Sequence, residues 1–172
     1  IGLWYVPEMR SWHTAVWTGT EMIVWGGIYF VHLNSGGRFN PATGSWTMRA
    51  PMPTARALHG ATAADGKIYV MGGAFDTSTI YSSMEIYDPV SDSWSAGPDM
   101  PLGKFSLSAS TLDNRIYAIG GTYSLGSLNH VAAFDLGSRT WSEVAPMNTR
   151  RVRFASAVAG NLVYAIGGTT VF

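Results

Sequence analysis

Short apolar segments recur along the chain, each preceded by a segment of small and polar residues. Residues 116–119 and 162–166 are apolar runs of strand length, and residues 106–110 and 155–159 before them are rich in Ala and Ser. Turn sequences separate the two kinds of segment, and Asp65-Gly66 is the clearest, because Asp-Gly between apolar runs is a strong hairpin signal. The pattern predicts an all-β chain of short antiparallel strands.

The pattern is periodic. Gly-Gly pairs at 26–27, 72–73, 120–121 and 167–168 follow one another at intervals of 46, 48 and 47 residues. A basic residue stands sixteen positions before each pair, at Arg10, Arg56, Lys104 and Arg151, and a tryptophan follows the first three pairs, at Trp46, Trp94 and Trp141. Self-similarity at this period indicates a repeat architecture.

One period contains four predicted strands, here named a to d in chain order. In the second copy they cover residues 57–64, 67–71, 84–87 and 93–95, and residues 88–92 have the composition of a turn. The spacing between the glycine pair and the following tryptophan is the only one that varies, so the segment between strands b and c is expected to be a loop.

This combination resembles the Kelch repeat: paired glycines after an apolar strand, then an aromatic-Asp or aromatic-Asn pair such as Tyr87-Asp88, then Trp, then Met-Pro and a basic residue. The resemblance implies a β-propeller with four-stranded antiparallel blades. Residues 1–172 would form one propeller segment of about three and a half blades, at 10–49, 56–97, 104–144 and 151–172. Such rings close with about six or seven blades, so we expect the chain to be part of a larger ring.

Side-chain size is consistent with wedge-shaped blades. Strand a carries small residues, as in Gly60-Ala-Thr-Ala-Ala64, which suits the crowded axis. Strand b is apolar at consecutive positions, as expected for a strand covered on both faces. The tryptophans fall on strand d, so we expect them farthest from the axis.

Composition narrows the function. Charged residues make up 13% of the chain and the formal net charge is zero, which argues against a nucleic-acid partner. No apolar run approaches the roughly 20 residues of a membrane-spanning helix. Cysteine is absent, which excludes disulfides and the Cys-Tyr cofactor of the copper radical oxidases that use Kelch-like propellers. The cellular compartment is left open.

In Kelch propellers the b–c and d–a loops commonly form the ligand face. Here the b–c loops are 28–37, 74–83 and 122–130, and their aromatic and amide side chains suit stacking on, and hydrogen bonding to, a peptide or sugar. Arg153 has no basic counterpart in the other copies, where Trp12, Leu58 and Ser106 stand, so it is the best single candidate for ligand contact. The candidate ligand-binding residues are Arg153, Arg151, Tyr29, His32, Asn34, Phe75, Asp76, Tyr81, Tyr123, Asn129 and His130.

The repeated basic residues are more readily explained by a structural role, bonding loop carbonyls or a neighbouring acid in every blade. His13 and His59 are expected to be packed histidines, since apolar residues replace them in later copies. We expect no metal site and no cofactor, because His32 and His130 have no ligand spacing and no positioned pair of acids is available for catalysis.

Non-catalytic binding of a protein or peptide is therefore the favoured function. A carbohydrate-binding or sugar-mutarotase propeller is the first alternative, and a structural part of a larger surface protein is the second. The remaining blades of the ring, from missing sequence or from another chain, are the other expected partner.

Overall fold

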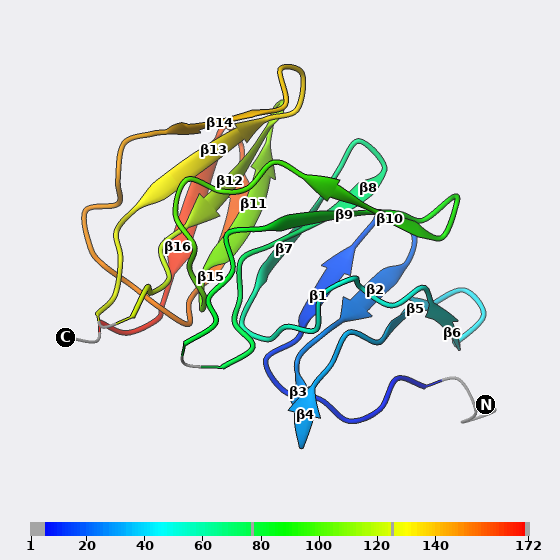
Figure 1. The fold of residues 1–172 in the computed structure, drawn as a ribbon. Helices are drawn as coiled ribbons and strands as arrows, with labels where there is room; N and C mark the ends of the chain where they lie inside the picture. The colour runs from blue at the N-terminus through cyan, green and yellow to red at the C-terminus, as the bar shows by residue number, and fades with distance from the viewer. Residues whose placement is uncertain (1–5, 77, 125, 171–172) are drawn as a thin grey trace.

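The computed structural model describes residues 6–76, 78–124 and 126–170, and every regular element in them is a β-strand. Three antiparallel sheets have four strands each, and a fourth sheet has two (Figure 1). Blade 1 contains β1 (Thr14–Trp17), β2 (Met22–Trp25), β5 (Gly36–Asn40) and β6 (Ser45–Arg49). Blade 2 contains β7 (Gly60–Ala64), β8 (Lys67–Met71), β9 (Met84–Asp88) and β10 (Ser93–Gly97).

The later part of the chain repeats this arrangement. Blade 3 contains β11 (Ser108–Leu112), β12 (Arg115–Ile119), β13 (Val131–Asp135) and β14 (Thr140–Glu143). The fourth sheet pairs β15 (Ala155–Ala159) with β16 (Leu162–Ile166), and a short hairpin, β3 (Ile28–Tyr29) with β4 (Val31–His32), projects from the loop after β2. Sheet order follows chain order in each blade, so the all-β blade architecture predicted from the sequence is confirmed.

The predicted strands of the second copy match with small differences. Strand b at 67–71 is correct, while strands c and d extend to Asp88 and Gly97. The first strand begins at Gly60, three residues later than expected. Leu58 has a φ of 58°, which an extended strand cannot contain, so Ala57 forms only an isolated bridge to Ala74.

Small residues on the first strand of each sheet allow neighbouring blades to meet closely. Strands β1, β7, β11 and β15 contact one another in that order. Hydroxyl groups link them: Thr62 Oγ1 lies 3.0 Å from Thr111 Oγ1, and Ser110 Oγ lies 2.6 Å from Ser156 Oγ. These strands form the inner surface of the arc.

The repeat tryptophans lie on the outermost strands, as predicted, and Trp94 and Trp141 connect consecutive blades. The indole of Trp94 donates to the carbonyl of Ala50 at 2.9 Å, and that of Trp141 donates to Pro98 at 2.9 Å. Each acceptor belongs to the segment that leaves the preceding blade. The indole therefore fills the wide outer part of the wedge and also bonds across it.

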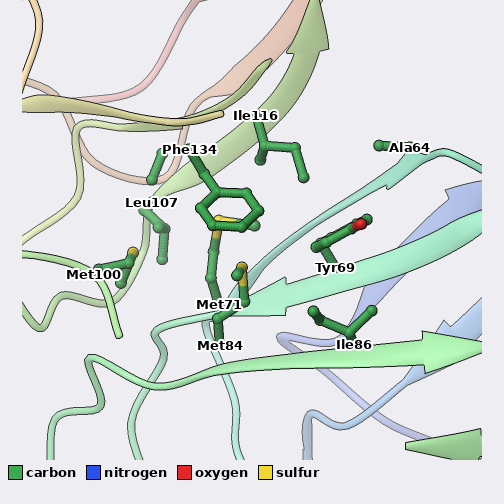
Figure 2. Close-up of a cluster of buried hydrophobic side chains, with 10 residues drawn as sticks. Ala64, Tyr69, Met71, Met84, Ile86, Met100, Leu107, Ile116 and Phe134 are labelled. Atoms are coloured by element: carbon green, nitrogen blue, oxygen red, sulfur yellow. The ribbon is translucent and has the colours of Figure 1, made fainter. Parts of the chain in front are cut away.

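Two hydrophobic cores lie between blades, where facing sheets bury their side chains. Figure 2 shows the core between blades 2 and 3, in which Met71 and Met84 meet Phe134 and Ile116, all at most 1% exposed. The other core joins blades 1 and 2 and contains Val16, Ile23, Trp25, Met52, Ile68, Val70 and Tyr87. The stability of each blade consequently depends on its neighbour.

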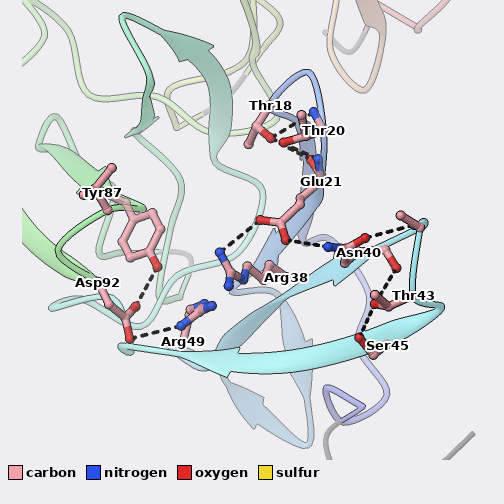
Figure 3. A network of polar contacts seen from close by, with 12 residues as sticks. Thr18, Thr20, Glu21, Arg38, Asn40, Thr43, Ser45, Arg49, Tyr87 and Asp92 are labelled. Carbon is pink, nitrogen blue, oxygen red and sulfur yellow. Dashed lines mark hydrogen bonds and ion pairs between the residues drawn. The ribbon is translucent and has the colours of Figure 1, made fainter.

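Polar groups reinforce the contact between blades 1 and 2 (Figure 3). The Asp92 carboxylate accepts a hydrogen bond from Tyr87 Oη at 2.6 Å and lies 3.7 Å from Arg49 Nη1 of the preceding blade. Nearby, Glu21 pairs with Arg38 at 3.1 Å and accepts a hydrogen bond from the Asn40 amide.

Candidate ligand-binding face

The b–c and d–a loops lie on one face because they are hydrogen-bonded to each other. Ala57 pairs with Ala74 and Phe105 with Thr122, so the end of each d–a loop joins the start of a b–c loop. In Figure 1 these loops run along the bottom and the left of the molecule, and the hairpins after β5, β9 and β13 point to the right and the top. The b–c and d–a loops therefore share one face of the blades.

Asn34 and Asn129 hold this face together. The Asn34 amide donates to the Met52 carbonyl at 3.0 Å, and the Met52 N–H donates back to the Asn34 carbonyl at 2.8 Å. Asn129 and Met147 form the same reciprocal pair. Both side chains therefore have an architectural role, which leaves fewer of their groups for a ligand.

The repeated basic side chains bond the carbonyls at the end of strand b, as the structural explanation predicted. Arg56 is buried, donates to Gly72 O at 2.8 Å and pairs with Glu85 at 2.8 Å. Arg151 donates to Gly167 O at 2.7 Å. Lys104 donates to Ala118 O at 2.9 Å. Burial lowers the pKa of Lys104 to about 7 and lowers that of Arg56, which the Glu85 carboxylate opposes.

A ring of four equivalent residues forms where the blades converge. Trp12, Leu58, Ser106 and Arg153 all have positive φ, between 53° and 58°. The Leu58 N–H donates to Trp12 O at 2.9 Å, the Ser106 N–H to Leu58 O at 2.8 Å, and the Arg153 N–H to Ser106 O at 3.3 Å. The main chain thus links four successive blades, and the side chains of Trp12 and Arg153 are exposed to solvent.

This ring, called the mouth ring below, lines a hollow. The hollow has a volume of about 380 Å³ and is lined by Trp12, His13, Leu58, His59, Ser106, Leu107 and Arg153. Arg153 is exposed and forms no side-chain hydrogen bond or ion pair with another described residue. Its guanidinium is therefore available to a ligand, whereas Arg56 is committed to the fold.

The two histidines of the hollow differ. His59 is buried, with Nε2 2.8 Å from Thr14 Oγ1 of blade 1, which confirms the packed role. His13 is exposed, so the packed role predicted for it is wrong. Trp12 and Leu58 stand out in the sequence only as the counterparts of Arg153. Because neither is a glycine, nothing in their identity signals the positive φ that brings them to the mouth.

Aromatic side chains extend the face outwards. Phe30 is 90% exposed at the tip of the β3–β4 hairpin, with its ring centroid 4.5 Å from that of Tyr29. The structure brings His32 and Phe75 together from two blades, with ring centroids 4.8 Å apart. Tyr123 is exposed on the third loop.

The remaining predicted residues are occupied by contacts within the protein. Asp76 accepts hydrogen bonds from Ser78 and the Thr79 N–H, which hold its pKa at about 2. The Tyr81 ring lies 4.8 Å from the Arg56 guanidinium carbon. His130 lies 3.2 Å from Lys104 Nζ and 3.3 Å from Glu143. Among the described residues, the exposed candidates whose side chains form no hydrogen bond or ion pair are Arg153, Tyr29, Phe75 and Tyr123.

Two further kinds of feature are absent from the described residues. No helix in them is long and apolar enough to cross a bilayer. No three His, Cys, Asp or Glu side chains in them come together as a metal-binding group.

Radially arrayed antiparallel blades with a loop-built hollow at the axis define a β-propeller. The family model of the KLHDC2/KLHL20/DRC7 Kelch-repeats domain matches residues 5–168, and the chain belongs to the Kelch-repeat family. Proteins of this family generally act as protein-binding scaffolds.

Three curated relatives share parts of the sequence. Beta-scruin of Limulus polyphemus is 33% identical over 47% of this chain and 10% of its own length. Kelch-like protein terF of Aspergillus terreus is 38% identical over 40% of this chain and 16% of its own. Kelch-like protein 40 of Mus musculus is 47% identical over 28% of this chain and 8% of its own. The matches therefore cover a small part of each relative.

Proposed function

We propose that the loop face binds a protein or peptide without catalysis, through the mouth ring and the exposed aromatic side chains of the b–c loops. One observation carries this proposal: large apolar side chains exposed to solvent gather on these loops. They are Trp12, Tyr29, Phe30, Val31, Phe75 and Tyr123. Exposed apolar groups concentrated on one face are typical of a protein interaction site.

The backbone at Phe30 supports the same conclusion. Its φ is 57°, an uncommon conformation for a bulky residue. The side chain is nevertheless 90% exposed, so packing within the chain offsets little of this cost. Strained backbone is found most often at functional sites. A ligand that buries the Phe30 ring would provide the missing stabilisation.

Arg153 supplies the polar part of the proposed site. An arginine fork matches a carboxylate, and Trp12 and Leu58, which line the same hollow, offer apolar contact. We therefore expect the ligand to combine an acidic group with apolar or aromatic side chains. His32, Asn34, Asp76, Tyr81, Asn129, His130 and Arg151 would contribute mainly by shaping the loops.

A random-peptide phage library panned on the immobilised protein tests the proposal. Phe30→Asn should weaken capture of the enriched peptides by about tenfold or more, since an exposed aromatic anchor is worth about 1–2 kcal/mol. Asn tolerates positive φ well, so the free energy of unfolding should stay the same or rise by up to about 1 kcal/mol. Val90→Asn is the matched control, because Val90 is 94% exposed on a c–d turn of the opposite face.

The sugar alternative is distinguished by a glycan array with the same proteins. Saturable sugar binding that is lost in Arg153→Ala would overturn the peptide proposal. If the wild type, Phe30→Asn and Arg153→Ala capture the peptides equally strongly, the loop face is not the peptide-binding site.

We also propose that further blades of the same ring, from missing sequence or another chain, cover the fourth sheet. Leu162, Tyr164 and Ile166 are exposed along β16. An apolar hollow of about 280 Å³ separates this strand from blade 3. Native mass spectrometry that finds a stable, monomeric 18.5 kDa species would contradict this proposal.

A further inference from the structure

Blade 3 holds its loops by a different chemistry from blade 2. In blade 2 the buried cation is Arg56, and it bonds Ser83 and the Glu85 carboxylate. Blade 3 has Lys104 at the position of Arg56, His130 at the position of Ser83, and Ala132 at the position of Glu85. A permanently charged group with a carboxylate partner is thus replaced by two groups that both titrate.

Lys104, His130 and Glu143 form a chain from the interior to the surface. Lys104 is fully buried, with Nζ 2.9 Å from Ala118 O, 3.2 Å from His130 Nδ1 and 3.5 Å from His130 O. On the other side of the imidazole, Nε2 lies 3.3 Å from Glu143 Oε1. The three groups come from the loop before β11, the loop before β13 and β14, respectively.

The donors and acceptors fix the state of the imidazole. A carboxylate only accepts, so Nε2 must carry the hydrogen that Glu143 accepts. Nδ1 is then the lone-pair nitrogen, and it accepts from the Lys104 amine. One added proton can be shared between Nζ and Nδ1. A second proton puts a hydrogen on both nitrogens and places two positive charges 3.2 Å apart.

We propose that the Lys104–His130 contact is a pH-sensitive latch on the third b–c loop, which acidification opens by adding this second proton. The protonated imidazole keeps its hydrogen bond to Glu143, and this bond now joins a cation to an anion. The imidazole moves away from Lys104. The His130 carbonyl also accepts a hydrogen bond from the Gly120 N–H at 2.9 Å. Movement of His130 therefore loosens the end of β12 as well. The latch does not depend on the identity of a ligand.

The direction of the pH effect follows from burial. Burial lowers the pKa of His130, Lys104 lowers it further, and Glu143 opposes both. In the open form the imidazole is hydrated and away from Lys104, and Glu143, whose side chain is 69% exposed, shifts the pKa little from the ordinary histidine value near 6.5. The open form therefore takes up the proton first. The latch is therefore closed above about pH 6.5 and is lost as the pH falls towards the lower pKa of the closed form.

Amide hydrogen exchange measured by NMR tests the proposal, with rates corrected for the intrinsic effect of pH. Gly120 and Leu128 report on the latch, since their N–H groups bond His130 O and Gly121 O. Their protection should fall between about pH 7.5 and pH 5, by up to about tenfold per pH unit within the window between the two pKa values. Gly72 and Tyr81, the equivalent amides of blade 2, should keep theirs.

Variants separate the latch from general acid sensitivity. His130→Asn retains an acceptor for Lys104 but does not titrate, so the loss of protection should disappear. His32→Asn removes a histidine from the blade 1 loop and should leave the loss unchanged. The triple variant Lys104→Arg, His130→Ser, Ala132→Glu, which copies the residue types of blade 2, should also be insensitive to pH.

Two results would overturn the latch: wild-type Gly120 and Leu128 equally protected at both pH values, or a persistent loss of protection in His130→Asn. If that variant does not fold, the ring signals of His130 in the wild type decide. Their titration midpoint must lie below about 6.5 and coincide with the loss of protection, and a separate midpoint would contradict the proposal.

Discussion

Glycine has two separate roles in this chain, and blade 1 contains an example of each. Gly26 and Gly44 have almost the same φ, 66° and 65°. A Cβ on Gly26 would lie 2.7 Å from the Arg56 carbonyl oxygen, whereas a Cβ on Gly44 would meet nothing within 4 Å. The first glycine is required by close packing as well as by conformation, and the second by conformation alone.

We therefore expect the two alanine variants to differ in stability. Gly44→Ala should cost about 1 kcal/mol, the usual penalty for a left-handed alanine. Gly26→Ala should cost about 3 kcal/mol or more, because the added methyl also displaces the next blade's loop. Urea unfolding measures both, and equal losses would show that the close approach has no energetic weight.

At the scale of a single blade, the buried guanidinium of Arg56 needs an acidic partner, and the repeat does not supply one in every copy. Glu85 lies on β9 and pairs with Arg56, while Gly37 and Ala132 stand at the equivalent positions. Both members of this pair are almost completely buried. Removing one partner of such a pair leaves an uncompensated charge in the interior.

Glu85→Ala should accordingly lower the free energy of unfolding by about 3 kcal/mol or more. Glu8→Ala is the comparison, since Glu8 is half exposed and lies 4.0 Å from Arg10. That variant should lose less than about 1 kcal/mol. Similar losses in the two proteins, measured by chemical denaturation, would contradict the special role of the buried pair.

The elements were predictable wherever the repeat carries the signal. The Asp65-Gly66 turn, the strand after it and the outward position of Trp94 follow from residue types that recur at fixed spacing. The Glu85 pairing was not predictable, because the acid occurs in one copy only.

The candidate site was harder to predict than the fold. The sequence identified Arg153 as a departure from the repeat, but the left-handed backbone of Trp12 and Leu58 has no sequence signature. The architectural use of Asn34 and His130 depends on contacts between different loops, and that of Asp76 on a turn within its own loop. The repeat spacing alone predicts neither.

Over the whole molecule, stability is transmitted through contacts between adjacent blades, and His59 belongs to one of them. Its pKa is lowered to about 3, first by burial and then by the charges of Arg56 and His13. Unfolding exposes it to water, where the pKa returns to about 6.5. The unfolded chain therefore binds the proton more readily, and stability falls as the pH decreases from about 6.5 towards 3.

His59→Leu should reduce this acid sensitivity, because Leu107 occupies the equivalent position in blade 3. The wild type should lose up to about 1.4 kcal/mol per pH unit from this group within the window. Urea unfolding at about pH 7 and pH 4.5 measures the difference between the two proteins. An unchanged slope in the variant would mean that other groups control the acid response.

The mouth ring has a consequence for how such proteins diverge. Its continuity depends on peptide groups alone, and tryptophan, leucine, serine and arginine already occupy its four places. Replacing any one of these side chains changes the chemistry of the hollow and leaves the main-chain hydrogen bonds between blades intact. Mutation can therefore vary the lining of the hollow without the loss of folding that usually accompanies change at a junction between structural units.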